Sequence, residues 1–214
     1  QVSRNINVRD SVQMYADNVR VLAGAYVYAT GASSEVYIQA RTDLLVAGAT
    51  DTEADAIIKA DRLVHLFAPV ASVSGYVQAG LNLQAAGSGR ILMNVGQTLN
   101  VSGGFVTSNG NIELNPVGHT VLLGTLAARG DNANIIINAA DSLELRGDLI
   151  ANRDIVINAG SVVNAGEVSI ETFGTAHLVS ESGAGRVMIN GLNDVVINSR
   201  IVDLDLDTID QVTQ

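Results

Sequence analysis

The sequence predicts an all-β fold in which parallel strands wind into a β-solenoid. Three observations predict it: a repeat of about 21 residues, apolar residues spaced two apart inside each repeat, and turn-forming Gly, Asn, Asp and Ser between the apolar runs. Alternation at a spacing of two is the period of a strand, and no stretch sustains the spacing of an amphipathic helix. The 214 residues therefore predict about ten coils of roughly 21 residues in one elongated domain, residues 1–214.

The repeat is clearest in a five-residue cluster that reads apolar, variable, apolar, Asn and then a small residue or Pro. Its copies are ILMNV (Ile91 to Val95), IELNP (Ile112 to Pro116), IIINA (Ile135 to Ala139), IVINA (Ile155 to Ala159) and VMING (Val187 to Gly191). Stacked asparagines can exchange side-chain amide hydrogen bonds between coils. We therefore expect a structural ladder of Asn94, Asn115, Asn138, Asn158 and Asn190. The alternative is that each Asn supports its own turn.

A second apolar pair follows each cluster after about eight residues, and weaker apolar positions lie beyond it. The second pairs are Leu99 with Val101, Val121 with Leu123, Leu143 with Leu145, and Val195 with Ile197. The weaker positions are Phe105, Leu126, Leu149 and Ile150. Each coil is therefore expected to have three sides, and inward apolar residues of successive coils should stack into one continuous core.

The first 90 residues lack the asparagine but keep the spacing. Val36 and Ile38 are followed by Leu44 and Val46 at the same interval of about eight, so we extend the solenoid to the N-terminus. Ala49 to Ala60 (ATDTEADAIIKA) is expected to be a protruding loop or a short helix. The 32 residues from Asn158 to Asn190 predict a shortened coil or an inserted loop there.

The ends and the composition bear on partners. Neither end carries an evident amphipathic capping helix, and an uncapped coil exposes strand edges and apolar surface. We therefore expect a part of a longer chain or filament, or a subunit that associates end to end. The net charge of −10 argues against nucleic acid as a partner. The absence of any apolar stretch of 18 residues argues against a membrane span.

Two segments resemble a known family of surface proteins. NIIINAADSLELRGDLIANRDIVINAG (Asn134 to Gly160) and NIELNPVGHTVLLGT (Asn111 to Thr125) are similar to the repeats of filamentous-haemagglutinin-like exoproteins. The resemblance covers roughly Asn82 to Leu206. It implies a right-handed parallel β-helix that is secreted or displayed at a bacterial cell surface, in attachment or matrix. A host-cell or matrix glycan or protein would be its ligand, and the location would be extracellular.

Residues with catalytic potential are few and scattered. His65, His119 and His177 fall in different coils without a shared register, and the series Asp203, Asp205 and Asp207 is more typical of a solvated strand face than of an acid/base pair. The chain has no Trp, five Tyr and three Phe, which leaves little for a sugar-stacking platform. We therefore expect a non-catalytic protein with no cofactor and no metal site.

Three alternatives stay open at this point. A carbohydrate-active β-helix, either a polysaccharide lyase or a hydrolase, would need carboxylates clustered in a groove on one sheet face. An intracellular head-to-tail polymer similar to the bactofilins would also use short β-helical subunits. The tyrosines, all within the first 80 residues, form either an exposed stripe for a partner or part of the packing: Tyr15, Tyr26, Tyr28, Tyr37 and Tyr76.

Overall fold

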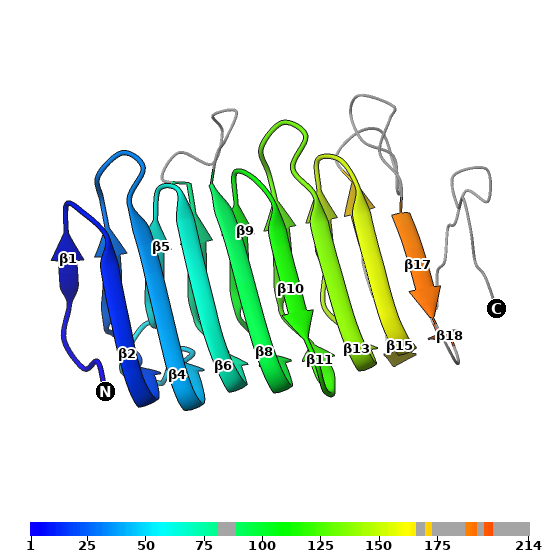
Figure 1. The fold of residues 1–214 in the computed structure, drawn as a ribbon, viewed down its shortest axis with the longest axis horizontal. Helices are drawn as coiled ribbons and strands as arrows, with labels where there is room; N and C mark the ends of the chain where they lie inside the picture. Colours follow the sequence, from blue (N-terminus) through cyan, green and yellow to red (C-terminus); the bar gives the residue numbers. More distant parts are fainter. Residues whose placement is uncertain (81–88, 166–169, 173–186, 192–194, 199–214) are drawn as a thin grey trace.

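The chain forms an elongated stack of parallel β-coils, as the repeat predicts (Figure 1). The computed structural model describes residues 1–80, 89–165, 170–172, 187–191 and 195–198, with side chains as far as residue 159. Every element in these ranges is a strand, and every pairing between them is parallel. The all-β solenoid prediction is therefore confirmed.

Two sheets run along the stack. The larger one has ten strands in the described residues, and most of them are long: β2 (Val12–Val21), β4 (Glu35–Val46), β6 (Leu63–Val73), β8 (Arg90–Val101), β10 (Ile112–Pro116), β11 (Thr120–Leu122), β13 (Ile135–Leu145), β15 (Ile155–Ala165), β17 (Val187–Gly191) and β18 (Val195–Asn198). The smaller one has eight short strands: β1 (Ile6–Val8), β3 (Tyr26–Ala29), β5 (Ile57–Ala60), β7 (Tyr76–Ala79), β9 (Phe105–Ser108), β12 (Thr125–Ala128), β14 (Leu149–Ala151) and β16 (Ile170–Thr172).

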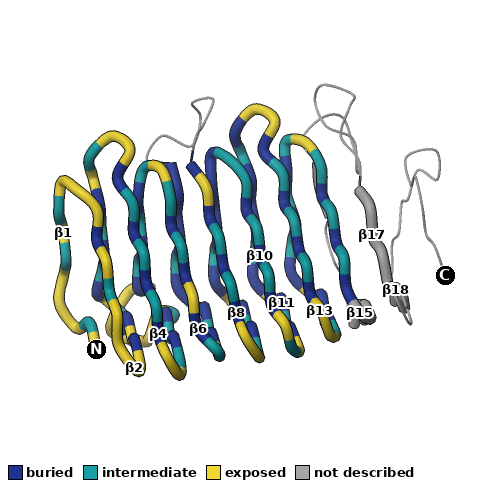
Figure 2. The backbone as a smooth tube through the Cα atoms, in the orientation of Figure 1, coloured by how far each residue is buried: buried dark blue, intermediate teal, exposed yellow. Residues whose placement is uncertain are grey.

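Each long strand has two arms that meet at a corner. In β4, β8 and β13 the alternation of buried and half-buried residues is interrupted by two exposed residues in succession (Figure 2), such as Gly96 and Gln97 in β8. The strand pairing shifts register near this point. Both prolines of the chain lie here, Pro69 beside the shift in β6 and Pro116 at the end of β10. A corner tolerates proline because the ladder that would need its missing N–H is interrupted there.

The two arms and the smaller sheet are the three sides that the spacing predicts. The first arm holds the five-residue cluster and the second arm holds the pair found about eight residues later. The third side is the smaller sheet, which includes the weaker apolar positions Phe105, Leu126 and Leu149. In the second arm one phase was wrong: Thr120 and Leu122 are buried, whereas Leu123 is 42% exposed. Pairing of Thr120 with Leu99 and Leu143 sets this phase, and the Thr120 hydroxyl donates to the Gly118 carbonyl at 3.3 Å.

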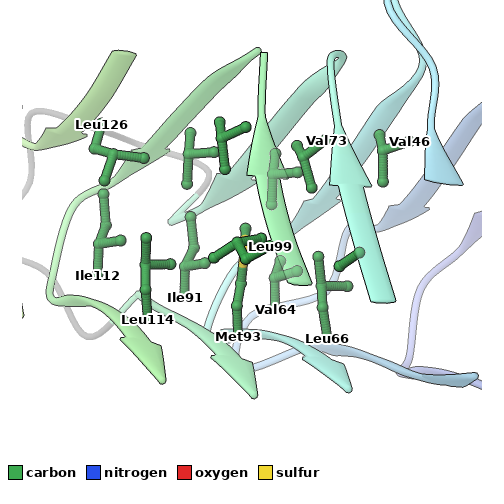
Figure 3. Packing of buried hydrophobic residues seen from close by; sticks show 14 of the residues in the cluster. Val46, Val64, Leu66, Val73, Ile91, Met93, Leu99, Ile112, Leu114 and Leu126 are labelled. Atoms are coloured by element: carbon green, nitrogen blue, oxygen red, sulfur yellow. The ribbon is translucent and has the colours of Figure 1, made fainter. Parts of the chain in front are cut away.

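Inward side chains form one core along the whole described stack (Figure 3). Pairing places like residues above one another, as in the column Leu66, Met93 and Leu114, each no more than 1% exposed. A coil cannot bury its inner face alone, so this stacking of apolar columns is what stabilises the fold.

The coils are fewer and longer than the prediction of ten. The eight-stranded sheet contributes one strand to each coil. From Ile91 to Ile112 a coil takes 21 residues, but from Val36 to Val64 it takes 28. Part of this extra length is an exposed loop over residues 47–56, closed by the hydrogen bond from Ala56 N to Ala47 O at 3.0 Å. The expected protrusion at Ala49 to Ala60 is therefore a loop without a helix, and its last four residues are strand β5.

Candidate functional site

The asparagines of the repeat lie in one column on the outer face of the first arm. Paired positions join Asn94 to Asn115 and Asn138 to Asn158. Their side chains are half-buried and hydrogen-bonded from coil to coil. The bonds run from Asn115 Nδ2 to Asn94 Oδ1 (3.1 Å), from Asn138 Nδ2 to Asn115 Oδ1 (2.8 Å) and from Asn158 Nδ2 to Asn138 Oδ1 (2.9 Å). The backbone of Asn190 pairs with that of Asn158, and its side chain lies outside the described residues.

This amide column has a direction, and it ends on a histidine. Every amide donates toward the N-terminal end of the stack, and Asn94 Nδ2 lies 2.9 Å from Nε2 of His65. Because Asn94 Oδ1 already accepts from Asn115, its NH₂ group faces the imidazole, and Nε2 must accept. The imidazole is therefore neutral with its proton on Nδ1. Sequence reasoning treated His65 as a lone histidine; aligning VYI (36–38) with VHL (64–66) would have placed it on this face.

A carboxylate and a guanidinium support the middle of the column. Asn115 Nδ2 also donates to Oε1 of Glu113 at 3.0 Å, and Glu113 forms an ion pair with Arg90. The hydrogen bond from Asn115 lowers the pKa of Glu113; burial opposes it, and Arg90 lowers the pKa further. The carboxylate thus stays ionised and accepting at neutral pH.

Aromatic side chains replace the amides in the first three coils. Following the register of the asparagine column toward the N-terminus gives Phe67, then Gln39, then Tyr15. Tyr37 lies between them, its ring 5.6 Å from that of Tyr15 and 4.9 Å, edge-on, from that of His65. Tyr15 is 64% exposed and Phe67 is 40% exposed. We call Tyr15, Tyr37, His65 and Phe67 the aromatic face.

A hollow of about 460 Å³ adjoins the aromatic face at the corner of β2 and β4. Its lining residues are Tyr15, Ala16, Asp17, Gln39 and Arg41. Asp17 and Arg41 face each other there, with Oδ1 3.6 Å from Nη1, and both side chains are largely exposed. An aromatic ring, an amide, a carboxylate and a guanidinium thus meet in one open site.

The remaining tyrosines lie on a different side of the coil. Tyr26, Tyr28 and Tyr76 belong to β3 and β7 of the smaller sheet and are half-buried. Tyr26 stacks on Tyr28 at 4.3 Å, and Tyr76 stacks on Phe105 at 5.5 Å. The five tyrosines therefore do not form one stripe, because Tyr15 and Tyr37 lie on the aromatic face and the other three serve packing on the third side.

The other sequence candidates do not join this site. His119 lies on the second arm, where its Nδ1 is 2.7 Å from the Ser142 hydroxyl oxygen. His177, Asp203, Asp205 and Asp207 lie outside the described residues. Within the described ranges, no group of three or more His, Cys, Asp or Glu side chains is placed to hold a metal ion. No helix in those ranges is long and apolar enough to cross a membrane.

Comparison with known proteins adds no family to this picture. No family model, curated protein or solved structure matches the chain. The similarity to filamentous-haemagglutinin-like repeats is supported at the level of the β-solenoid alone.

Protonation of His65 is expected to destabilise the fold in mildly acidic solution. Burial lowers the pKa of His65, and the nearby Arg90 charge lowers it further. The unfolded chain therefore takes up this proton more readily, and the free energy of unfolding should fall as pH drops below about 6.5, the unfolded value. A proton on Nε2 would also oppose the Asn94 NH₂ group. The measurement is urea denaturation at pH 7.5 and pH 5.5.

His65→Gln is the matched control for this effect. Glutamine can accept from Asn94 through Oε1 and does not titrate. The loss of stability between the two pH values should be smaller in His65→Gln than in the native chain, since His119 and His177 titrate in both. Equal losses would contradict the assignment of a neutral, accepting His65.

Proposed function

We propose that this chain is a non-catalytic structural or adhesive β-solenoid that acts at a bacterial cell surface or in a fibre or matrix. One observation carries the adhesive part: the outer face that is closed by asparagines in the later coils carries exposed aromatic rings in the first three. Tyr15 and Phe67 expose 64% and 40% of their surface, although half-buried amides serve the same positions elsewhere. Exposed aromatic rings that the fold does not require are typical of binding surfaces.

The composition of the hollow favours binding over cleavage. Asp17 is the carboxylate among its five lining residues, and it is paired with Arg41. Cleavage of a glycosidic bond commonly uses two carboxyl groups, one as acid and one as base or nucleophile. A ring, an amide and an ion pair suit recognition of a ligand without a chemical step.

An open strand edge supports the structural part. In the described residues β2 pairs with β4 along one edge, and the other edge meets a single bridge between Val2 and Val21. A row of unpaired backbone N–H and C=O groups can receive another strand. This edge fits end-to-end association with a further coil, within a longer chain or from a second copy.

Two assays test the proposal. Antibody against the purified chain should label intact source cells without permeabilisation, and the purified chain should bind host cells or matrix. Tyr15→Ala/Phe67→Ala should reduce that binding at least tenfold, whereas Leu123→Ala, an exposed apolar residue in another arm, should not. Labelling that requires permeabilised cells would favour an intracellular polymer. Release of products from polysaccharides would favour an enzyme.

A further inference from the structure

The hollow beside Tyr15 has the chemistry of a small carbohydrate site. We propose that Tyr15, Asp17, Gln39 and Arg41 bind a short neutral saccharide. This inference rests on the proposed adhesive function and names the ligand class for it. Its volume of about 460 Å³ falls within the range of about 300 to 1,000 Å³ found for small-molecule sites.

The Tyr15 ring provides an apolar platform that is already fixed in place. Tyr37 packs against it at 5.6 Å with the ring planes at 40°, and His65 braces Tyr37 from the next coil. The Tyr37 hydroxyl donates to Gln39 Oε1 at 3.3 Å, which further fixes this group. Because its position is set by neighbours, Tyr15 loses little side-chain freedom on binding. Its exposed surface can pack against the C–H face of a pyranose ring.

The polar groups suit hydroxyls better than ions. Arg41 presents several N–H donors in one plane, Asp17 presents two acceptor oxygens, and Gln39 Nε2 adds donors. Planar groups of this kind can bond two neighbouring hydroxyls of a sugar at once. The charges of Asp17 and Arg41 cancel at 3.6 Å, so the hollow does not select an anionic or a cationic ligand. A neutral saccharide matches both features.

The site can be altered without unfolding the chain. Asp17 and Arg41 are 73% and 82% exposed, and an exposed ion pair contributes about 0–1 kcal/mol to stability. Tyr15 is mostly exposed and lies outside the buried core. Substitutions here therefore separate binding from folding, which thermal melts of each variant would verify.

The experiment is a screen of neutral and anionic oligosaccharides against the full chain, followed by calorimetric titration of the best neutral binder. Tyr15→Ala and Arg41→Gln should each weaken binding at least tenfold. Tyr15→Phe, which keeps the ring, and Leu123→Ala should bind as the native chain does. An unchanged Kd in Tyr15→Ala would overturn the proposal, as would binding restricted to anionic glycans and abolished by salt.

The outcomes also separate this inference from the proposed function. If the chain binds host cells but no neutral saccharide, the saccharide site is wrong and adhesion stands. A peptide that binds instead, with Tyr15→Ala reducing its affinity, would also overturn the saccharide and identify the aromatic face as a protein-binding surface. If a neutral saccharide binds at Tyr15 but cells do not bind, the site stands and the adhesive role fails.

Discussion

Gly124→Ala is expected to lower the free energy of unfolding by about 3 kcal/mol. Gly124 belongs to a column of glycines, Gly75, Gly104, Gly124 and Gly147, at the corner between the second arm and the smaller sheet. A Cβ on Gly124 would collide with the carbonyl oxygen of Gly104 and lie 3.0 Å from its nitrogen. The oxygen cannot simply move away, because it accepts the Thr125 N–H at 3.0 Å in the ladder.

The matched control for this prediction is Gly96→Ala. Gly96 also lies at a corner, but a Cβ there would meet one atom, the Pro69 Cα at an ordinary 3.5 Å. Its cost should stay within about 0.5 kcal/mol. Urea denaturation of the two variants, followed by circular dichroism, makes the comparison. Equal losses would mean that general glycine flexibility, and not close backbone stacking, explains the Gly124 position.

The fold was predictable because stacking leaves a periodic record in the sequence. The cluster around Asn94 and its copies identified the first arm, since an inward apolar residue must recur wherever a coil passes the core. The pair Val36 and Ile38 extended the same reasoning to coils without asparagine, and pairing of β4 with β2 and β6 confirms it.

The length of the coils and the phase of one arm were not predictable in the same way. Loop 47–56 adds residues outside the core, so it changes the coil length without changing the apolar pattern. At Thr120 the inward position is polar, because the Gly118 carbonyl satisfies its hydroxyl, and the apolar Leu123 nearby suggested the wrong phase. Local hydrogen bonding decided this case over hydrophobicity.

The aromatic face was missed for a related reason. Its residues Tyr15, Tyr37 and Phe67 are far apart in the sequence and share no motif, and composition argued against a sugar platform. They meet because the register of β2, β4 and β6 stacks outward positions that the core pattern leaves unconstrained. A search of the residues flanked by inward apolar pairs would have found the cluster, since those positions share one outer face.

Asn115→Ala is expected to lower the free energy of unfolding by about 2 kcal/mol. Asn115 donates to Asn94 and Glu113 and accepts from Asn138, so the substitution removes three hydrogen bonds. Each contributes about 0.5 to 1.5 kcal/mol net, and water can reach this half-buried site to replace part of them. Asn18→Ala, an exposed asparagine in the same type of strand, should cost less than about 0.5 kcal/mol.

Two further measurements distinguish a ladder from mere packing. Asn115→Ala should raise the pKa of Glu113, because the hydrogen bond from Asn115 is the main cause of its low value. The depressed pKa stabilises the fold above the unfolded value of about 4.3, and this contribution is lost as pH falls through the folded pKa. The variant should therefore lose less stability on acidification than the native chain.

Asn115→Asp tests the direction of the column. Aspartate keeps the shape and the acceptor for Asn138, but at neutral pH it places acceptors against Asn94 Oδ1 and the Glu113 carboxylate. Its loss of stability should equal or exceed that of Asn115→Ala at pH 7 and diminish as the carboxyl groups protonate toward pH 4, because a protonated carboxyl group can again donate. A loss that is the same at both pH values would mean that the amide column does not depend on donation from Asn115.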